Sequence, residues 1–282
     1  MKNINQVKVL LEALPYIKRH SDEIFVIKYS GLAQTSSELK EKFARDIVLM
    51  YLMGIKPVIV HGGETAIGNM LERLNINNHF IDGIRVTDEK VMEVSEMVLS
   101  GSINKEITAL LNEHGAQAIG VSGKDAAMIK AKPINMQKYG YVGDITKVDP
   151  KVINNLIAEK FIPVIAPIAT GQASGHPGFN VNADIAAGHI AVSLKARKII
   201  FMTDAPGVIN DEKEIIHTLN KNQIGTLKAK GTIARDMIPK IDACLNALNG
   251  GVVKAHIIDG RIEHALLLEI FTSEGIGTVI KQ

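Results

Sequence analysis

Residues 24–31, IFVIKYSG, decide the fold. Four apolar residues run directly into Lys28, and a Ser-Gly turn follows Tyr29. This pattern predicts a buried strand that ends on a cation and a tight loop. Ligands of open α/β sheets bind at the carboxyl edge of the strands, which makes Lys28 a candidate for a ligand contact. The alternative is an ordinary surface lysine at a strand end. Residues 58–63, VIVHGG, argue against it because they repeat the same plan.

The composition limits the class of protein. A chain of 282 residues suits one large domain or two modest lobes. Its formal net charge of +2 is spread along the chain and leaves no basic face for nucleic acid. The single cysteine, Cys244, excludes an internal disulfide framework and fits a reducing cytosol. Apolar neighbours at helical spacing predict that Cys244 lies in the core.

Targeting and membrane signals also bear on the class. The longest uncharged run, residues 161–183, is broken by prolines and glycines, so it does not predict a membrane span. The N-terminus lacks the pattern of a signal peptide. We therefore expect a cytoplasmic protein with neither a membrane nor a nucleic acid as partner.

Strands alternate with helices along most of the chain. A helix from 92 to 112 is expected to begin near Thr87 or Asp88, both of which are candidate N-caps. Residues 128–148 contain short alternating runs, as in β-hairpins. Periodicity predicts further helices at 38–53, 64–74, 152–160, 185–194, 237–248 and 263–271, and strands at 56–60, 117–121, 161–168, 198–202 and 252–257. This order implies a three-layer αβα sandwich around a mainly parallel sheet, with a lobe boundary expected at 194–198.

An amphipathic helix precedes the first strand. Apolar residues recur at helical spacing through residues 7–17, and Pro15 predicts a bend. This helix is an extension to the core fold. It either packs on its own domain or docks on a partner subunit, and the sequence leaves both open.

Glycines in the loops indicate an anionic ligand. Backbone N–H groups at such glycines and at the following helix N-termini bind anions. Several such loops in one chain favour a ligand with several anionic groups, such as a nucleotide. The glycines in question are Gly31, Gly62, Gly63, Gly123, Gly207 and Gly231.

Several familiar signatures do not match. A P-loop fails because Ala118 replaces its first glycine and Asp125 replaces its Ser or Thr. The sequence has no G-x-G-x-x-G fingerprint, no G-x-S-x-G elbow and no protein-kinase catalytic loop. The nine histidines form no H-x-x-x-H pair, so we expect no protein-built zinc site.

Two polar clusters remain. Asn180, Asn182 and Asp184 alternate, so in an extended segment they would point to one side and bind carboxylate or amide groups. The alternative is an Asx-rich turn with an N-cap. Lys240 follows a proline early in a helix, where the helix dipole disfavours a cation. Its position indicates an anionic ligand, with a solvated lysine as the alternative.

Six stretches, in this order along the chain, resemble the amino acid kinase family. They are 26–31 (VIKYSG), 61–63 (HGG), 82–87 (DGIRVT), 179–184 (FNVNAD), 203–207 (TDAPG) and 237–240 (MIPK). Among its members, the chain is most similar to those that phosphorylate N-acetyl-L-glutamate in arginine biosynthesis. The resemblance implies an N-terminal lobe, 1–195, that binds acetylglutamate and dimerises, and a C-terminal lobe, 196–282, that binds ATP with its Mg²⁺.

The resemblance also implies roles for individual residues. Lys28 and Lys240 would flank the transferring phosphoryl group, and Asp184 would hold both lysines. Arg85 would bind the α-carboxylate of acetylglutamate as a bidentate partner. The other residues that it implies in substrate binding are Gly62, Gly63, Asn180 and Asn182, and those in ATP binding are Gly31, Thr203, Asp204 and Gly207.

The N-terminal helix resembles the extension of the arginine-inhibited, hexameric members. Tyr16, Glu274 and Gly275 would then contribute to an arginine site. The resemblance implies feedback inhibition by L-arginine and assembly as a homodimer or as a trimer of dimers.

Three positions depart from the family pattern, because Ser30, Glu64 and the pair Arg235-Asp236 replace usual glycines. A positive φ at Ser30 would cost about 1 kcal/mol or more. Glu64 and Asp236 add negative charge where phosphate gathers, and one carboxylate at ~6 Å opposes it by roughly 3 kcal/mol. Two alternatives to an active kinase for acetylglutamate therefore stay open. One is a kinase of the same fold for glutamate, aspartate, carbamate or UMP, and the other is a catalytically weak protein that binds arginine or acetylglutamate.

Overall fold

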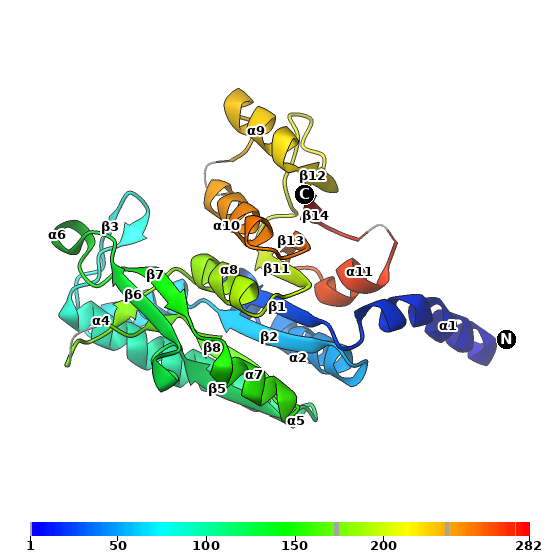
Figure 1. The fold of residues 1–282 in the computed structure, drawn as a ribbon, viewed down its shortest axis with the longest axis horizontal. Coiled ribbons are helices and arrows are strands. Elements are labelled where there is room, and N and C mark those ends of the chain that lie inside the picture. Colours follow the sequence, from blue (N-terminus) through cyan, green and yellow to red (C-terminus); the bar gives the residue numbers. More distant parts are fainter. Residues whose placement is uncertain (1, 172–174, 235–236, 274) are drawn as a thin grey trace.

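A central sheet of eight strands organises the molecule (Figure 1). The computed structural model describes residues 2–171, 175–234, 237–273 and 275–282. The strand order is β12-β14-β13-β11-β1-β2-β8-β5, and the six strands from β13 to β5 run parallel. Strand β14 pairs antiparallel with β13 and parallel with β12 at the edge. The strands are β1 (Ile24–Tyr29), β2 (Lys56–His61), β5 (Ala118–Ser122), β8 (Ile162–Ala166), β11 (Lys198–Thr203), β12 (Thr218–Asn220), β13 (Lys254–Asp259) and β14 (Thr278–Lys281). The prediction of a mainly parallel sheet between helices is confirmed.

Helices cover both faces of the sheet and bury two apolar clusters. In β1, Phe25 and Ile27 face one cluster while Val26 faces the other, as the period of a strand requires. Lys28 therefore shares the face of Val26. That face is covered by α7 (Lys151–Ala158), α8 (Ala183–Ser193), α9 (Lys221–Lys230) and α10 (Ile238–Asn249). The opposite face is covered by α2 (Ser37–Leu52), α3 (Glu64–Arg73), α4 (Glu89–Glu96), α5 (Asn104–Glu113) and α11 (Ala265–Phe271). Cys244 is buried in the first cluster, as predicted.

The helix predicted at 92–112 is longer in the structure than the sequence suggested, and it is not purely α-helical. It begins at Glu89, one residue after its N-cap Asp88, whose side chain accepts a hydrogen bond from Val91 N. The π-helix Met97–Ile103 then separates α4 from α5. Small antiparallel pairs project around the sheet, namely β3 (Phe80–Ile81) with β4 (Ile84–Arg85), β6 (Ile129–Pro133) with β7 (Gly143–Val148), and β9 (Ile168–Ala169) with β10 (Phe179–Asn180). The hairpin predicted within 128–148 is confirmed, and it carries the short helix α6 (Met136–Tyr139).

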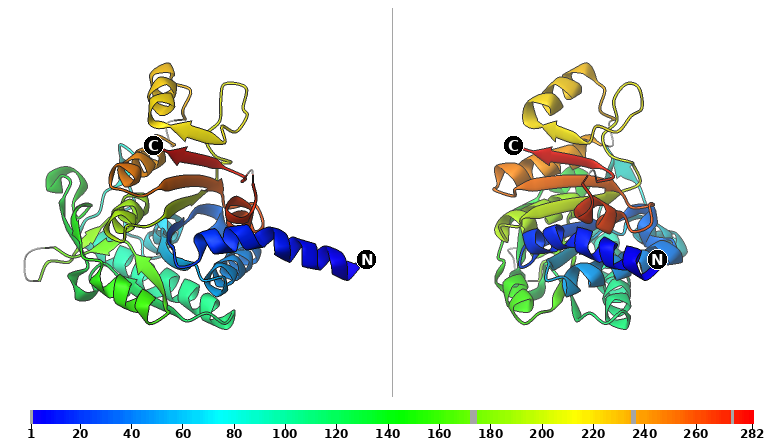
Figure 2. Two further views of the ribbon diagram at one scale, coloured as in Figure 1. Left: turned by 45° about the vertical axis from the view of Figure 1, so that its right-hand side comes forward. Right: turned by 90° about the vertical axis from the view of Figure 1, so that its right-hand side faces the viewer.

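The N-terminal helix α1 (Lys2–His20) runs through Pro15 and projects from the body of the molecule (Figure 2). Its C-terminal end packs on α11, and the His20 ring meets the Phe25 ring edge to face at 5.2 Å. Leu11 and Leu14 nevertheless stay exposed. One end of α1 therefore packs on its own chain. The exposed leucines leave docking of the rest of the helix on a partner subunit open.

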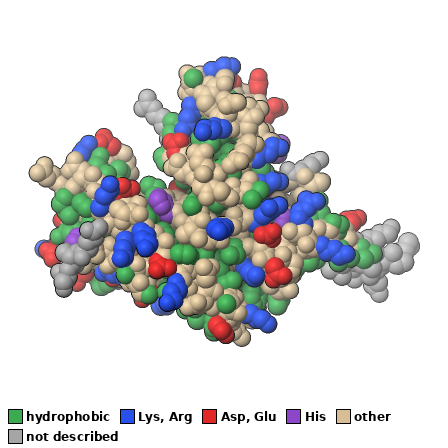
Figure 3. All heavy atoms as spheres, in the orientation of Figure 1, with side chains coloured by type: hydrophobic (Ala, Val, Ile, Leu, Met, Phe, Trp, Pro, Cys, Tyr) green, Lys and Arg blue, Asp and Glu red, His purple; other side chains and the backbone are tan. Residues whose placement is uncertain are grey.

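The surface mixes charges of both signs. On the face that Figure 3 shows, lysine and arginine side chains are scattered among acidic and apolar ones. This distribution agrees with the small formal net charge of +2. None of the described helices combines the length and the apolar character that a bilayer crossing needs.

Candidate active site

Lys28 and Asp184 form a buried ion pair at the carboxyl edge of the sheet. Lys28 Nζ lies 2.8 Å from Asp184 Oδ1, and each residue is only 7% exposed. The strand β1 brings the lysine to this edge, and the first turn of α8 brings the aspartate. The ammonium also donates a hydrogen bond to Ser30 Oγ. Ser30 is not among the described residues with positive φ, so its replacement of glycine carries no backbone strain.

The N-terminus of α8 positions Asp184. Asn182 is the N-cap, and its Oδ1 accepts hydrogen bonds from Asp184 N at 2.8 Å and Ile185 N at 3.2 Å. The expectation that Asn180, Asn182 and Asp184 share one side of an extended segment is wrong, because the strand covers only Phe179–Asn180. Asn182 is an exposed cap, as the alternative interpretation held. Asn180 is half-buried, and its N–H donates to Tyr141 O.

The loop after β2 lies beside the loop after β1. Gly62 N donates to Tyr29 O at 2.9 Å. A Cβ at Gly62 would lie 3.2 Å from Ser30 Cβ and 3.9 Å from Ala183 Cβ, so glycine keeps the two loops and α8 close together. Gly63 precedes α3 as its N-cap residue, with an extended φ of 176°. The structure thus brings together Lys28, Asp184, Gly62 and the first turns of two helices.

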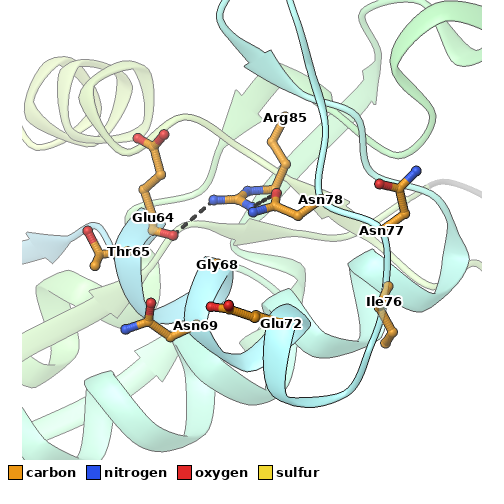
Figure 4. Close-up of a pocket in the computed structure, with 9 residues that line it drawn as sticks. All are labelled: Glu64, Thr65, Gly68, Asn69, Glu72, Ile76, Asn77, Asn78 and Arg85. Atoms are coloured by element: carbon orange, nitrogen blue, oxygen red, sulfur yellow. Dashed lines mark hydrogen bonds between the residues drawn. The ribbon is translucent and has the colours of Figure 1, made fainter.

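Arg85 lines a neighbouring cavity of about 580 Å³ (Figure 4). Its guanidinium donates to Glu64 O at 2.9 Å and to Asn78 Oδ1, and lies 4.8 Å from the centre of the Phe80 ring. Burial lowers the pKa of Arg85, and the Glu64 charge opposes this shift. The Glu64 side chain itself is exposed, and its backbone oxygen is what meets the guanidinium. The cavity is lined by Glu64, Thr65, Gly68, Asn69, Glu72, Ile76, Asn77, Asn78 and Arg85.

The predicted nucleotide residues lie at the carboxyl ends of two neighbouring strands, Gly31 after β1 and the other three at or after the end of β11. Gly31 has a φ of +78°, and a Cβ there would lie 2.4 Å from Asp204 Oδ1, so the Gly31 and Asp204 loops touch. Thr203 Oγ1 accepts a hydrogen bond from Ala205 N at 2.8 Å, which ties the turn after β11. Gly207, with a φ of +138°, packs against Thr278.

Lys240 lies in the first turn of α10, which packs against α8. It is half-buried, and it precedes Cys244 by about one helical turn. Burial raises the pKa of the Cys244 thiol, and the charge of nearby Asp184 raises it further. The helix that carries Lys240 therefore approaches the ion pair of Lys28. Arg235 and Asp236 lie outside the described residues, as does Glu274.

A second polar cluster lies toward the amino-terminal ends of the strands, opposite the Lys28 site, and the sequence analysis missed it. It consists of four buried residues, His20, Lys198, His256 and Glu269, with His256 Nδ1 at 2.6 Å from Glu269 Oε1. Burial lowers the pKa of Lys198 to about 8, with the neighbouring Lys254 charge adding to the shift. The missed signal was a charged or imidazole side chain within each of three strongly apolar elements, β11, β13 and α11.

Of the predicted arginine residues, the two that the structure describes, Tyr16 and Gly275, lie near this second cluster and not at the Lys28 site. A Cβ at Gly275 would lie 2.7 Å from Glu269 Oε2, and the same carboxylate accepts hydrogen bonds from Ile276 N and Gly277 N. Tyr16 is half-buried one turn before His20 on α1.

Comparisons with known proteins agree with this geometry. The amino acid kinase family profile matches residues 23–259. The acetylglutamate kinase of a Nitratiruptor species is 62% identical over 99% of this chain and 98% of its own length. The N-acetylglutamate synthase from Neisseria gonorrhoeae, solved with coenzyme A and N-acetyl-glutamate, superimposes with a TM-score of 0.86 at 26% identity, over 98% of this chain and 63% of that chain. The same synthase, solved with coenzyme A and L-arginine, gives a TM-score of 0.82 at 25% identity, over 98% and 65% of the two chains. The chain therefore belongs to the amino acid kinase family, among its acetylglutamate kinases.

Proposed function

We propose that this kinase transfers the γ-phosphoryl group of ATP to the γ-carboxylate of N-acetyl-L-glutamate. The observation that carries the proposal is the buried Lys28–Asp184 pair, set at the carboxyl edge of the sheet beside Gly62. The relatives at more than half identity over their whole length support the same reaction. The product is an acyl phosphate, and the step belongs to arginine biosynthesis.

The chemistry of the step suits the residues at this edge. A carboxylate is ionised at neutral pH, so the nucleophile needs no general base. The obstacle is the repulsion between two anions, which fixed cations and backbone N–H groups reduce. Lys28 supplies one such cation, and Asp184 holds its ammonium at a fixed point. Lys240 supplies a second cation from the start of α10, and the loops at Gly31 and Gly62 supply N–H groups.

The donor set at this edge fits phosphate oxygens. Among the described residues, no three His, Cys, Asp or Glu side chains converge in a way that could hold a metal ion. Mg²⁺ prefers to keep several waters and to bind through substrate phosphates. Mg²⁺ would arrive bound to ATP and would offset part of the charge of its phosphate oxygens. Asp204, across from Gly31, lines the nucleotide side.

The cavity at Arg85 receives the amino acid end of the substrate. A guanidinium binds a carboxylate through two parallel hydrogen bonds, and partial burial strengthens the pair. Asn180 ends β10 and lies two residues before Asn182, the N-cap of α8. Arg85 therefore sets the α-carboxylate, which leaves the γ-carboxylate to approach Lys28.

The decisive test is a hydroxylamine-trapping assay with MgATP and N-acetyl-L-glutamate. The wild-type chain should form hydroxamate, and Lys28→Ala should lower kcat by about 10²- to 10³-fold because a transition-state contact is lost. Lys56→Ala is the matched control, since it removes an ion-paired lysine at the other end of a strand. No product from the wild-type chain would favour the binding-only alternative, and product from glutamate, aspartate, carbamate or UMP instead would favour another kinase of this fold.

We also propose that L-arginine inhibits the enzyme at the second polar cluster. The buried Glu269 carboxylate, the half-buried Tyr16 and the loop at Gly275 lie where α1 meets α11. A guanidinium is the natural partner of such a carboxylate. Arginine should inhibit the wild-type chain and raise its Tm, and Glu269→Gln should weaken both effects at least tenfold in arginine concentration. Unchanged activity and Tm in the presence of arginine would refute the proposal.

The exposed leucines of α1 support assembly. Leu11 is 57% exposed and Leu14 is 41% exposed, which is unusual for neighbouring apolar side chains on one helix. We propose that α1 joins dimers into a hexamer. Light scattering should give a hexamer for the full chain and a dimer for Leu11→Lys combined with Leu14→Lys.

A further inference from the structure

The backbone of Gly62 is held by contacts from three segments. Gly62 N donates to Tyr29 O of β1. Gly62 O accepts a hydrogen bond from Gln34 Nε2 at 3.2 Å, and it lies 3.1 Å from His61 Nδ1. Gln34 ends the 3₁₀ turn Gly31–Gln34, which is separated only by Ser30 from the strand that carries Lys28. Two side chains thus hold one carbonyl oxygen of the phosphate-facing loop.

The hydrogen-bond chemistry fixes the tautomer of His61. A carbonyl oxygen only accepts, so Nδ1 carries the hydrogen and Nε2 is an acceptor. Asn104 Nδ2 lies 3.2 Å from His61 Nε2 and supplies the matching donor. His61 and Asn104 are both fully buried. Burial also lowers the pKa of His61 to about 4, which keeps the ring neutral near pH 7.

The orientation of the Asn104 amide is fixed in turn. Its Nδ2 also faces two carbonyl oxygens, Val164 O at 2.9 Å and Val121 O at 3.3 Å. Lys105 Nζ donates to its Oδ1 at 3.2 Å. A Cβ at Gly120 would lie 1.9 Å from the same oxygen, so the amide fits only because that position is glycine. A relay therefore runs from the sheet through Asn104 and His61 to Gly62 O.

The relay sets the direction of one N–H group. In a trans peptide the carbonyl and the following N–H point in opposite directions, so a fixed Gly62 O fixes the Gly63 N–H. Gly63 is the N-cap residue of α3, whose first N–H groups have no partner within the helix. We propose that Gln34 and His61 are positioning residues for phosphoryl transfer, which hold the Gly62–Gly63 peptide so that the Gly63 N–H donates to the transferring phosphoryl group. This inference rests on the proposed kinase reaction.

A purely structural role predicts different behaviour. Gln34 Nε2 also donates to Tyr29 O at 3.0 Å, so a brace for the turn would account for its presence. A brace would affect stability and the binding of substrates alike. A fixed N–H directed at developing charge affects the transition state more than the ground state, and so lowers kcat with little change in KM.

Gln34→Met is the deciding variant, because Gln34 is only half-buried and methionine keeps the shape while removing the donor. We expect kcat to fall at least tenfold, with KM for ATP and for N-acetyl-L-glutamate within threefold of wild type. Tyr51→Phe is the matched control, since it removes one side-chain hydrogen bond to a backbone carbonyl, Lys160 O, at the other edge of the sheet. A kcat within twofold of wild type, or an equal loss in the control, would overturn the proposal.

Two substitutions of His61 separate its two nitrogens. Asn places its amide nitrogen near the position of Nδ1, whereas Gln reaches only toward the position of Nε2. His61→Asn should therefore retain at least fivefold more kcat than His61→Gln. Equal losses would overturn the role of His61, and if either variant fails to fold, Gln34→Met decides the proposal alone.

A readout besides turnover separates this inference from the proposed function. MgADP with tetrafluoroaluminate and N-acetyl-L-glutamate imitates the transferring phosphoryl group, and its binding is measured by thermal shift. The complex should form with Gln34→Met at least tenfold more weakly than with wild type, and equal binding would overturn the inference. Failure of the proposed function would look different, because wild type itself would then form neither hydroxamate nor this complex.

Discussion

Ser30 shows how a departure from the family pattern becomes part of the site. Its hydroxyl accepts a hydrogen bond from the Lys28 ammonium, and its backbone needs no positive φ. Glycine at this position would leave the ammonium with one partner fewer. The strain that a positive φ at Ser30 would bring is therefore absent, and the residue helps Asp184 to hold the cation.

Ser30→Ala should lower kcat about tenfold, since a hydrogen bond to a charged group contributes roughly 1.5–3 kcal/mol and alanine leaves the backbone unchanged. Steady-state kinetics on the hydroxamate assay measure the effect. Ser193→Ala is the control, because it removes a comparable hydroxyl, bonded to Ile190 O, from the far end of α8. A kcat equal to wild type would show that Asp184 alone holds Lys28.

Single residues were predictable where the chemistry is local. Lys28 closes an apolar run, and Gly62 and Gly63 follow another, so each stood out in the sequence. Gln34 did not, because its contact with Gly62 O joins residues 28 positions apart and depends on the strand order. Glu269 and His256 escaped for the same reason, since only the fold brings them to one buried point.

Elements with strong periodicity were predicted, and weakly apolar ones were missed. The strands β1, β2 and β11 contain long apolar runs, whereas β12 and β14 are short and α9 offers few apolar residues, and these three elements were not anticipated. The π-helix Met97–Ile103 was also missed, because a wider helical turn leaves the apolar spacing nearly unchanged. Its role becomes visible only where it meets Gly63.

The contact between the π-helix and Gly63 gives a prediction at the scale of elements. A Cβ at Gly63 would lie 2.3 Å from Ile103 Cδ1 and 2.7 Å from Leu99 Cδ2. The φ of Gly63 is extended, so alanine is excluded by packing alone. Gly63→Ala should cost about 1–3 kcal/mol in the free energy of unfolding and should displace α3 from the site.

Removal of the Ile103 Cδ1 methyl group tests whether this packing contact causes the loss. Ile103→Val deletes Cδ1, so the double variant should recover at least half of the stability and of the kcat that Gly63→Ala loses. Urea unfolding of the four proteins in the cycle measures the coupling free energy. Additive effects of the two substitutions would mean that the packing contact does not set the position of the loop.

At the scale of the whole molecule, the Lys28 site and the proposed arginine site lie at opposite ends of the sheet strands. Lys28 lies one residue before the end of β1 and Lys198 begins the neighbouring β11, so the two proposed sites share one parallel sheet. Sequence reasoning predicted the sheet and its ligand edge because parallel strands place their carboxyl ends together. The other edge had no such rule to point to it.

Buried histidines make the stability of the whole molecule depend on pH. Burial lowers the pKa of His61 and of His20 to about 4, and it lowers the pKa of His256 as well. Between pH 4 and the ordinary value of 6.5, the unfolded chain binds protons at these sites that the folded chain does not. The free energy of unfolding therefore rises with pH across this window. Burial raises the pKa of Asp46 to about 6, which opposes the trend between about pH 4 and 6.

The contribution of His61 is isolated by comparing how steeply the free energy of unfolding depends on pH in wild type and in a His61 variant. A pKa near 4 in the folded state and 6.5 in the unfolded state makes His61 contribute about 2 kcal/mol of stability between pH 4.5 and 6.5, all of it lost as the pH falls. In His61→Phe, the difference in unfolding free energy between these two pH values should shrink by that amount, whatever the absolute stability of the variant. Urea titrations at four pH values measure it, with His79→Phe, at an exposed position, as the control. Identical pH dependence in His61→Phe and wild type would show that folding does not lower the pKa of the buried imidazole.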